Sequence, residues 1–326
     1  MWKSQGGGND FFRLPSKNIT KKEGIYIKRH LFTLLLPCIL LLSGCGQAPG
    51  ETAAPAGTAS PTAAETTPPA DDLPGPEVWE MTCRIVDGAE TGKLLLAEVE
   101  NGLYDGTGVY SFAVGDTPVW IDGAEATAAD LADGMLVTVC WNGMVAESYP
   151  AQLGATYSLR AEREDTDDRC GLWLQVLEDL WAVDDGLNGG ITQVGVDLSQ
   201  VPGLTDGERS AIAWAFATAH NVSSVTGTLE ELWEEGYFTP TTEPVSGPDS
   251  LALYWWEDGV HFSIDVDEDA VWNLPSLGPG EEPPELVAFD AQKWRSGLGA
   301  YFFGDCVGRR GEDGAWTYTV GAELIA

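Results

Sequence analysis

Residues 172–181, Leu-Trp-Leu-Gln-Val-Leu-Glu-Asp-Leu-Trp, decide how the C-terminal half of this chain is interpreted. Their apolar side chains recur at helical spacing, and the polar ones occupy the other side. Asp167 or Asp168 can cap the start of the helix, and Asp185-Gly186 marks its end. The pattern therefore predicts an amphipathic helix with one face on a hydrophobic core.

Two further helices are predicted by capping boxes, Thr205 with Glu208 and Thr228 with Glu231. Short strand candidates lie between the helices at 194–196 and 222–225. From residue 251 onward the pattern is that of strands, at 251–256, 260–266, 286–289, 299–303 and 316–320. Helices followed by a run of strands predict an α+β domain over residues 161–326 with an antiparallel sheet. Surface loops are predicted at 240–248 and 274–284.

Residues 78–160 form a separate region of many short strands. Residues 79–85 alternate apolar and polar side chains, and further strands are predicted at 94–97, 109–114, 119–121 and 135–141. Asn142-Gly143 predicts a two-residue hairpin turn, and residues 127–130 a single helical turn between strands. This pattern predicts a small OB-like β-barrel.

The N-terminal part contains an export signal. Lys28-Arg29-His30 is followed by a mostly apolar run over 31–42 and then by Ser43-Gly44-Cys45, as in a secretory signal peptide. The run is shorter than the roughly 20 residues that span a bilayer. Residues 1–27 fit no part of such a signal, and we hypothesise that translation starts near Ile27 or Lys28.

Leu42-Ser43-Gly44-Cys45 resembles the lipobox of bacterial lipoproteins. This resemblance implies that Cys45 carries a diacylglycerol, becomes the mature N-terminus and anchors the chain to the extracytoplasmic face of the bacterial cell membrane; an ordinary signal peptide with an incidental cysteine is the alternative. Residues 1–44 are then an upstream extension and a signal peptide. Residues 45–77, rich in Pro, Thr and Ala, are predicted to be a disordered tether.

The charge of the chain restricts its partners. The sequence holds 51 acidic and 17 basic residues, a formal net charge of -34. Two acids and seven bases precede Cys45, so the remainder carries 49 acids against 10 bases, or -39. This balance argues against nucleic-acid partners and against adsorption to an anionic membrane surface.

Several stretches resemble known bacterial proteins. Residues 135–139 and the sequence Glu-Ser-Tyr-Pro-Ala-Gln at 147–152 are similar to OB-like domains of unknown function in lipoproteins of Gram-positive bacteria. Residues 174–181, 289–303 and 318–323 resemble uncharacterised clostridial-type surface lipoproteins that pair this domain with the barrel. The resemblance implies a fold and a location in the cell envelope, but no activity.

Catalytic motifs are absent from the sequence. It contains no Gly-x-Ser-x-Gly elbow, no His-Glu-x-x-His metal helix and no phosphate-binding P-loop, and nothing in it predicts a cofactor. Carboxylate pairs such as Glu178-Asp179 are common in so acidic a chain and do not define a glycosidase. We therefore predict a non-catalytic ligand-binding or interaction module. The alternatives are a carboxylate-dependent envelope hydrolase and a structural assembly partner of envelope proteins.

Four residues are the candidates for ligand binding. Lys293 and Arg295 flank Trp294 just before two glycines, where they can receive an anion or form an internal salt bridge. Alternation along the strand sends Trp255 to the face opposite its two aromatic neighbours, while other tryptophans, including those at 173, 181 and 233, fall on predicted core faces. An exposed aromatic face predicts an envelope saccharide, a peptide or a protein as ligand.

The histidines and acidic clusters leave the question of a metal open. His261, Ser263, Asp265 and Asp267 share one face of a predicted strand, as in an oxygen-rich cation site or a solvated sheet face. Residues 184–189 superficially resemble a calcium loop but lack its alternating ligands and terminal glutamate. His220 ends a predicted helix, where a cationic side chain suits the helix dipole.

Four cysteines follow the predicted anchor, and they allow three complete pairings: Cys83, Cys140, Cys170 and Cys306. Export permits disulfides, whereas the anaerobic habitat implied by the resemblance does not favour them. Cys83 lies on an apolar strand face and is predicted to be a buried free thiol. Cys170 and Cys306 are the best candidates if one bridge exists.

Overall fold

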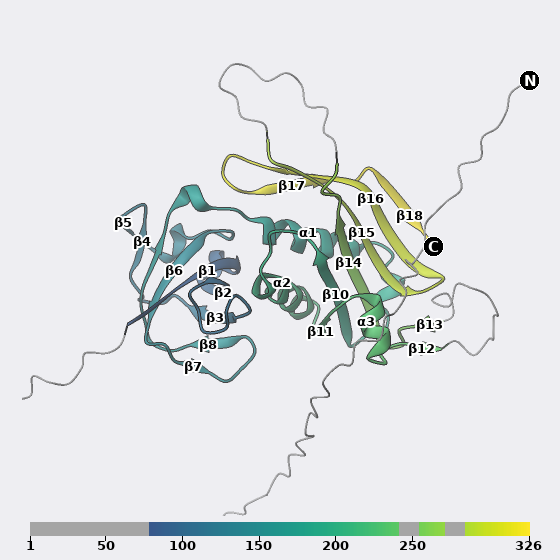
Figure 1. Ribbon diagram of the computed structural model, residues 1–326, viewed down its shortest axis with the longest axis horizontal. Coiled ribbons are helices and arrows are strands. Elements are labelled where there is room, and N and C mark those ends of the chain that lie inside the picture. Colours follow the sequence, from purple (N-terminus) through teal and green to yellow (C-terminus); the bar gives the residue numbers. More distant parts are fainter. Residues whose placement is uncertain (1–77, 241–253, 271–283) are drawn as a thin grey trace, which may run out of the picture. The chain divides into compact units, whose positions relative to one another are not determined.

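The computed structural model describes residues 78–240, 254–270 and 284–326 (Figure 1). Strands account for 45% of the described residues and helices for 21%. The fold is therefore β-rich and compatible with the α+β class that the sequence predicts. The predicted signal peptide, Cys45 and the tether lie outside the described residues. The two predicted loops, at 240–248 and 274–284, also lie outside the described residues, except for residues 240 and 284.

The first sheet is built from nine strands in the order β5-β4-β9-β6-β1-β2-β3-β8-β7. Most neighbours are antiparallel, but β3 pairs with β8 and β4 with β9 in parallel. The predicted helical turn is confirmed as a 3-10 turn at Ala128–Asp130 with a Thr127/Asp130 capping box; two others span Ala89–Thr91 and Arg163–Asp165. The strands are β1 (Trp79–Asp87), β2 (Lys93–Glu100), β3 (Val109–Ala113), β4 (Val119–Ile121), β5 (Ala124–Ala126), β6 (Leu136–Trp141), β7 (Val145–Ala146), β8 (Ala151–Leu153) and β9 (Thr156–Ala161).

Alternation along β1 explains how this sheet forms its own core. Met81, Cys83 and Ile85 point to one side and are almost completely buried. They pack with side chains from β2, β4, β6 and β9, including Val137 and Trp141. The period of two that is visible in the sequence is therefore the period of burial.

The predicted hairpin at Asn142-Gly143 is wrong. β6 ends just before these residues, but it pairs with β1 and β9, whereas β7 pairs only with β8. Gly143 has the positive φ that a turn requires, at 72°, and the Asn142 side chain accepts a hydrogen bond from the Met144 amide at 3.1 Å. The chain therefore turns here without bringing the flanking strands together.

The second sheet is also nine-stranded, in the order β11-β10-β14-β15-β13-β12, with β16 pairing β15 and both β17 and β18 pairing β16 (Figure 1). The helices are α1 (Arg169–Ala182), α2 (Asp206–Ala219) and α3 (Leu229–Glu234), with a 3-10 turn at Asp185–Asn188. The strands are β10 (Gln193–Gln200), β11 (Ser223–Thr226), β12 (Thr239–Pro240), β13 (Tyr254–Trp255), β14 (Gly259–Val266), β15 (Leu286–Ser296), β16 (Gly299–Arg310), β17 (Trp316–Thr319) and β18 (Ala322–Ile325).

This sheet is mixed rather than antiparallel, which corrects the prediction. β10 runs parallel to both β11 and β14, and only the pairs from β14 onward are antiparallel. The physical reason is that α2 separates β10 from β11 along the chain. A crossover helix returns the chain to the same end of the sheet, so the next strand lies parallel to the first.

The predicted helix caps are confirmed. Asp168 accepts a hydrogen bond from the Gly171 amide at the start of α1. Thr205 with Glu208 and the Thr228 pair form complete capping boxes at α2 and α3. Capping residues act within one helical turn, so their signal is readable from the local sequence.

One large core joins α1 and α2 to the inner face of the second sheet, and it also includes Val86, Leu95, Ala97 and Val109 of the first. The first turn of α2 approaches the first sheet closely at Gly207. Its amide donates a hydrogen bond to the Gly106 carbonyl at 2.9 Å, and a Cβ on this residue would lie 2.8 Å from another backbone oxygen.

All four cysteines within the described part of the chain are free and buried. The prediction of a buried free thiol at Cys83 is confirmed. Cys170 and Cys306 both belong to the large core, but they form no disulfide. Across residues 78–240, 254–270 and 284–326, no helix has the length and apolar character needed to cross a membrane.

Candidate functional site

An open pocket of about 550 Å³ lies where β12, β13 and the end of β15 meet the segment that follows α1. It holds both aromatic rings and charged groups. Its lining residues are Gly189, Gly190, Tyr237, Thr239, Trp255, Glu257, Asp258 and Arg295. This volume falls in the range of about 300–1,000 Å³ in which small-molecule sites are found.

Two half-buried aromatic rings, Tyr237 and Trp255, line the pocket. Tyr237 packs edge-on against the fully buried Trp256, with ring centroids 5.5 Å apart. Because alternate residues of a strand face opposite ways, burial of Trp256 turns Trp255 to the other side. Trp255 is held by pairing with Ser296 of β15 and with β12.

The Arg295 side chain is fixed in the pocket lining by backbone carbonyls. Its Nε donates to Trp256 O at 3.2 Å, and one Nη2 proton goes to Glu257 O at 2.7 Å. Its Nη1 donates to the carbonyls of Leu187 and Gly189, both at 2.8 Å. A guanidinium has five N–H bonds, so these contacts leave one for another acceptor.

Two carboxylates supply the acceptors of the pocket. Asp258 accepts hydrogen bonds from the side chains of Gln193 at 3.2 Å and Thr192 at 3.5 Å. Glu257 is exposed, and within the described residues no group donates to its carboxylate. The pocket thus combines aromatic faces, free acceptors and one fixed donor.

Lys293 and Trp294 lie elsewhere, in the interior of the protein. The Lys293 ammonium is completely buried and donates to the carbonyls of Val183, Asp184 and Trp181, at 2.8, 3.2 and 3.3 Å. Burial lowers the pKa of Lys293 to about 8, although the nearby Asp184 and Asp185 oppose the shift. This lysine therefore caps the C-terminal end of α1, where free carbonyls attract a cation.

Trp294 is 6% exposed and packs against Phe238, with ring centroids 5.2 Å apart. Of the four predicted binding residues, Trp255 and Arg295 therefore share the pocket, whereas Lys293 and Trp294 belong to the interior. The bonds made by Lys293 and Arg295 lead to backbone carbonyls rather than to the carboxylates of the predicted internal salt bridge.

Several residues of the pocket were missed by sequence reasoning, notably Tyr237, Glu257 and Asp258. The last two directly follow the three aromatic residues 254–256, and this acidic pair is the local signal that could have found them. Tyr237 follows α3, and only the pairing of β12 with β13 brings this part of the chain to the pocket.

The predicted core position of Trp233 is also wrong. Its side chain is 43% exposed, whereas Trp173 is buried and Trp181 is half-buried. α3 is short, and the side chain it buries is that of Leu232.

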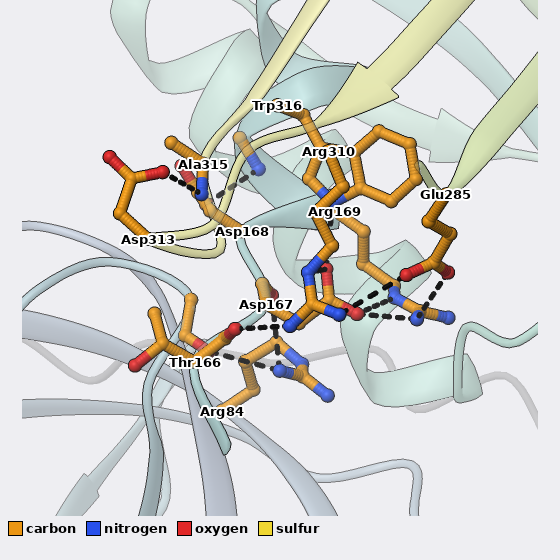
Figure 2. A network of polar contacts seen from close by, with 12 residues as sticks. Arg84, Thr166, Asp167, Asp168, Arg169, Glu285, Arg310, Asp313, Ala315 and Trp316 are labelled. Atoms are coloured by element: carbon orange, nitrogen blue, oxygen red, sulfur yellow. Dashed lines mark hydrogen bonds and ion pairs between the residues drawn. The ribbon is translucent and has the colours of Figure 1, made fainter. Parts of the chain in front are cut away.

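A second polar cluster surrounds Asp167 (Figure 2). Its carboxylate accepts hydrogen bonds from Arg169 and from the Trp316 indole at 2.8 Å, and Arg310 lies 3.9 Å away. Burial alone would raise the pKa of Asp167, but these bonds and the guanidinium charges lower it. Glu285 accepts from Arg310 at 3.1 Å, so the charges of this cluster are paired internally.

Next to that cluster, a hollow of about 300 Å³ is lined mostly by apolar side chains, with Arg169 and Glu285 on its wall. Arg169 and Glu285 are engaged in the cluster around Asp167, and the other charged groups of the lining are the carboxylates of Asp267 and Glu268. The neighbouring Asp168 caps α1, and burial raises its pKa to about 6.

The predicted cation face on β14 is not assembled as a metal site. His261 is 1% exposed and its Nε2 lies 2.9 Å from the Gly227 carbonyl, so it is part of the interior rather than of a solvated face. Asp265 lies at the surface, where partial loss of solvent and the negative charges of Asp290 and Asp197 raise its pKa. Within the described ranges, no group of three or more His, Cys, Asp or Glu side chains could hold a metal ion.

His220 has the structural role that its place in the sequence predicts. It is the C-cap residue of α2, stacks on Trp181 with ring centroids 3.8 Å apart, and lies 2.9 Å from the Glu178 carboxylate. The ring therefore ties the end of α2 to α1.

Comparison of the chain with protein-family models, with curated proteins and with solved structures gave no match.

Proposed function

We propose that this protein is a lipid-anchored, extracytoplasmic module that binds a small polar ligand without transforming it. The observation that carries the proposal is the pocket in which Trp255 and Tyr237 face free polar groups. Ligand sites typically combine a concave, partly aromatic wall with a few fixed polar groups that orient the ligand. The four bonds that hold Arg295 supply such a fixed group before any ligand arrives.

Binding is favoured over the alternative of a carboxylate-dependent hydrolase. Hydrolases of this kind need one carboxyl group whose pKa is raised so that it can donate a proton. Both carboxyl groups of the pocket are exposed, and Asp258 accepts hydrogen bonds from Gln193 and Thr192, so neither lies in the apolar surroundings that such an acid needs. The pocket carboxylates are better suited to accepting hydrogen bonds from a ligand.

We expect at least one of four probes to stabilise the full-length chain in detergent: chitotetraose, spermidine, citrate or tetra-alanine. At about 100 times its dissociation constant, a ligand of the native state raises the free energy of unfolding by roughly 2.7 kcal/mol. Thermal unfolding measures this as a saturable rise in the midpoint temperature.

The Trp255→Ala variant should lose that rise. Trp120→Ala should keep it, because Trp120 is an exposed tryptophan on β4 of the other sheet and does not line the pocket. Unchanged midpoints with all four probes, or a rise that persists in Trp255→Ala, would contradict a binding function at this pocket.

The membrane anchor is proposed from the residues around Cys45. A small-residue pair before a cysteine at the end of an apolar run supports lipidation. Two acyl chains give stable anchoring where a single chain gives only marginal binding. The net charge of -39 beyond Cys45 would keep the folded part from adsorbing to an anionic surface.

Replacing Cys45 with Ser is expected to abolish incorporation of labelled palmitate during growth in a bacterium that processes lipoproteins. The thioether to diacylglycerol requires the thiol, so the chain should also leave the membrane fraction. Cys38→Ser, inside the apolar run, is the matched control and should retain the label. Equal labelling of both variants would refute the anchor.

We also infer that the first sheet is an OB-like barrel. β1, β2 and β3 form an antiparallel meander, β8 lies parallel to β3, and β9 and β6 lead back to β1. Only Gly154 and Ala155 separate β8 from β9, so one continuous stretch links both ends of this ladder. β8 and β9 are joined along the chain and do not pair with each other, and this short return of the chain between the two ends of the ladder supports a barrel.

A further inference from the structure

The pocket holds fixed charges of both signs. The guanidinium of Arg295 cannot swing away, because four of its five N–H bonds are directed to backbone carbonyls. Opposite in sign stand the carboxylates of Glu257 and Asp258. A cationic ligand would meet the arginine, and an anionic one would meet both carboxylates within a strongly acidic protein. The electrostatics therefore favour a ligand without net charge.

The hydrogen-bonding groups favour a ligand rich in hydroxyls. Carboxylate oxygens only accept hydrogen bonds, and the free Nη2 proton of Arg295 only donates. Hydroxyl groups can do both, so neighbouring hydroxyls on one ligand could satisfy Glu257 and Arg295 together. The hydroxyl of Thr239 adds a further group of either kind.

The aromatic residues require an apolar face on the same ligand. Both rings are half-buried; Tyr237 packs against Trp256, and Trp255 lies on a strand that is paired on both sides, so each presents part of a ring to the pocket. A sugar ring combines a hydroxyl-bearing rim with a face of C–H groups. An acyclic polyol or an alanine peptide does not carry both features on one rigid ring.

We propose that the ligand of this pocket is a neutral saccharide, with a sugar ring stacked on Trp255 and its hydroxyls bonded to Glu257 and Arg295. This assignment rests on the binding function proposed above and specifies its ligand class. All the residues that line this pocket belong to the second sheet and to the segments that connect its elements.

The test is isothermal titration of the full-length chain in detergent with three neutral tetrasaccharides, chitotetraose, cellotetraose and mannotetraose. At least one should bind, and Trp255→Ala should weaken it by about ten-fold or more, which corresponds to the loss of one good stacking contact. Glu257→Gln should weaken it by about ten-fold, as expected for the loss of a charged acceptor. The Glu257 side chain is exposed, so this second variant leaves the fold intact.

Two controls show whether the effect belongs to the pocket. Trp120→Ala and Glu125→Gln replace an exposed tryptophan and an exposed glutamate of the first sheet, and should change the affinity by less than about two-fold. The affinity should also stay within about two-fold when the salt concentration rises ten-fold, because a neutral ligand gains nothing from long-range attraction.

The outcomes separate the two proposals. If spermidine or citrate binds in a way that depends on Trp255 while the three tetrasaccharides do not bind, the saccharide assignment is overturned and the binding function stands. If the affinity for a tetrasaccharide falls steeply as the salt concentration rises, the assignment of a neutral saccharide is likewise overturned and the binding function stands. If neither the tetrasaccharides nor the other probes bind, both proposals fail.

Discussion

Replacing Arg84 with Met should lower the free energy of unfolding by about 3–5 kcal/mol, the cost typical of removing one partner from a buried ion pair. Arg84 Nε lies 2.5 Å from the Glu208 carboxylate, and the two side chains are only 11% and 2% exposed. Arg84 Nη1 also donates to the carbonyls of Gly134 and Asp167, at 3.0 and 3.1 Å (Figure 2). Methionine fills similar space but leaves Glu208 charged and unpaired.

Urea unfolding followed by circular dichroism measures this loss. Arg163→Met is the matched control, because Arg163 pairs with Asp122 on the surface, where both side chains are more than 40% exposed. Its cost should be about 0–1 kcal/mol. Adding Glu208→Gln to Arg84→Met should recover part of the stability. Equal losses for the two arginine variants would contradict the importance given to the buried pair.

Replacing Glu98 with Ala is expected to cost about 3 kcal/mol or more, because each buried donor left unsatisfied costs roughly 1–3 kcal/mol. The Glu98 side chain is completely buried in the first sheet. It accepts hydrogen bonds from the Tyr110 hydroxyl at 2.7 Å and from the amides of Gly106 and Tyr104 at 2.8 and 3.2 Å. Burial and this carboxylate raise the pKa of Tyr110.

The same variant should speed hydrogen exchange of the amides in residues 101–108, since this loop is held by the Glu98 carboxylate. Glu100→Ala, an exposed glutamate on the same strand, should change neither the stability nor the exchange. Tyr110→Phe removes one donor together with its need for an acceptor, so it should cost less than Glu98→Ala. If Glu98→Ala lowers the stability but does not speed exchange in residues 101–108, the Glu98 carboxylate does not hold this loop, and the prediction is wrong.

Features set by neighbouring residues could be predicted from the sequence. The capping boxes at Thr205 and Thr228 predicted where α2 and α3 begin, because a cap satisfies amides within one turn of itself. Alternation in β1 predicted the burial of Met81, Cys83 and Ile85, whereas Trp79, at the start of the same pattern, is exposed. β15 is longer than predicted, since its polar positions are covered by contacts that are distant in sequence, such as those of Lys293 with the end of α1.

Pairing between distant segments was harder to predict. The parallel position of β10 depends on where α2 returns the chain, and the turn at Asn142-Gly143 has hairpin chemistry but strands that pair elsewhere. The same limit applies to the candidate site. Trp255 and Arg295 were found as separate signals, but which residues would face them depends on β12 and β13 coming together.

The position of β1 determines how the folded part would respond to mechanical load. β1 is the first described strand, and it is hydrogen-bonded along both edges, to β2 and to β6. A pull applied through the residues before it acts along the strand, perpendicular to these hydrogen bonds. Both ladders must then slide at the same moment, whereas an edge strand peeled from its free end loses its bonds one after another. The chain thus meets a force from its N-terminal side with a strand that is hydrogen-bonded along both edges.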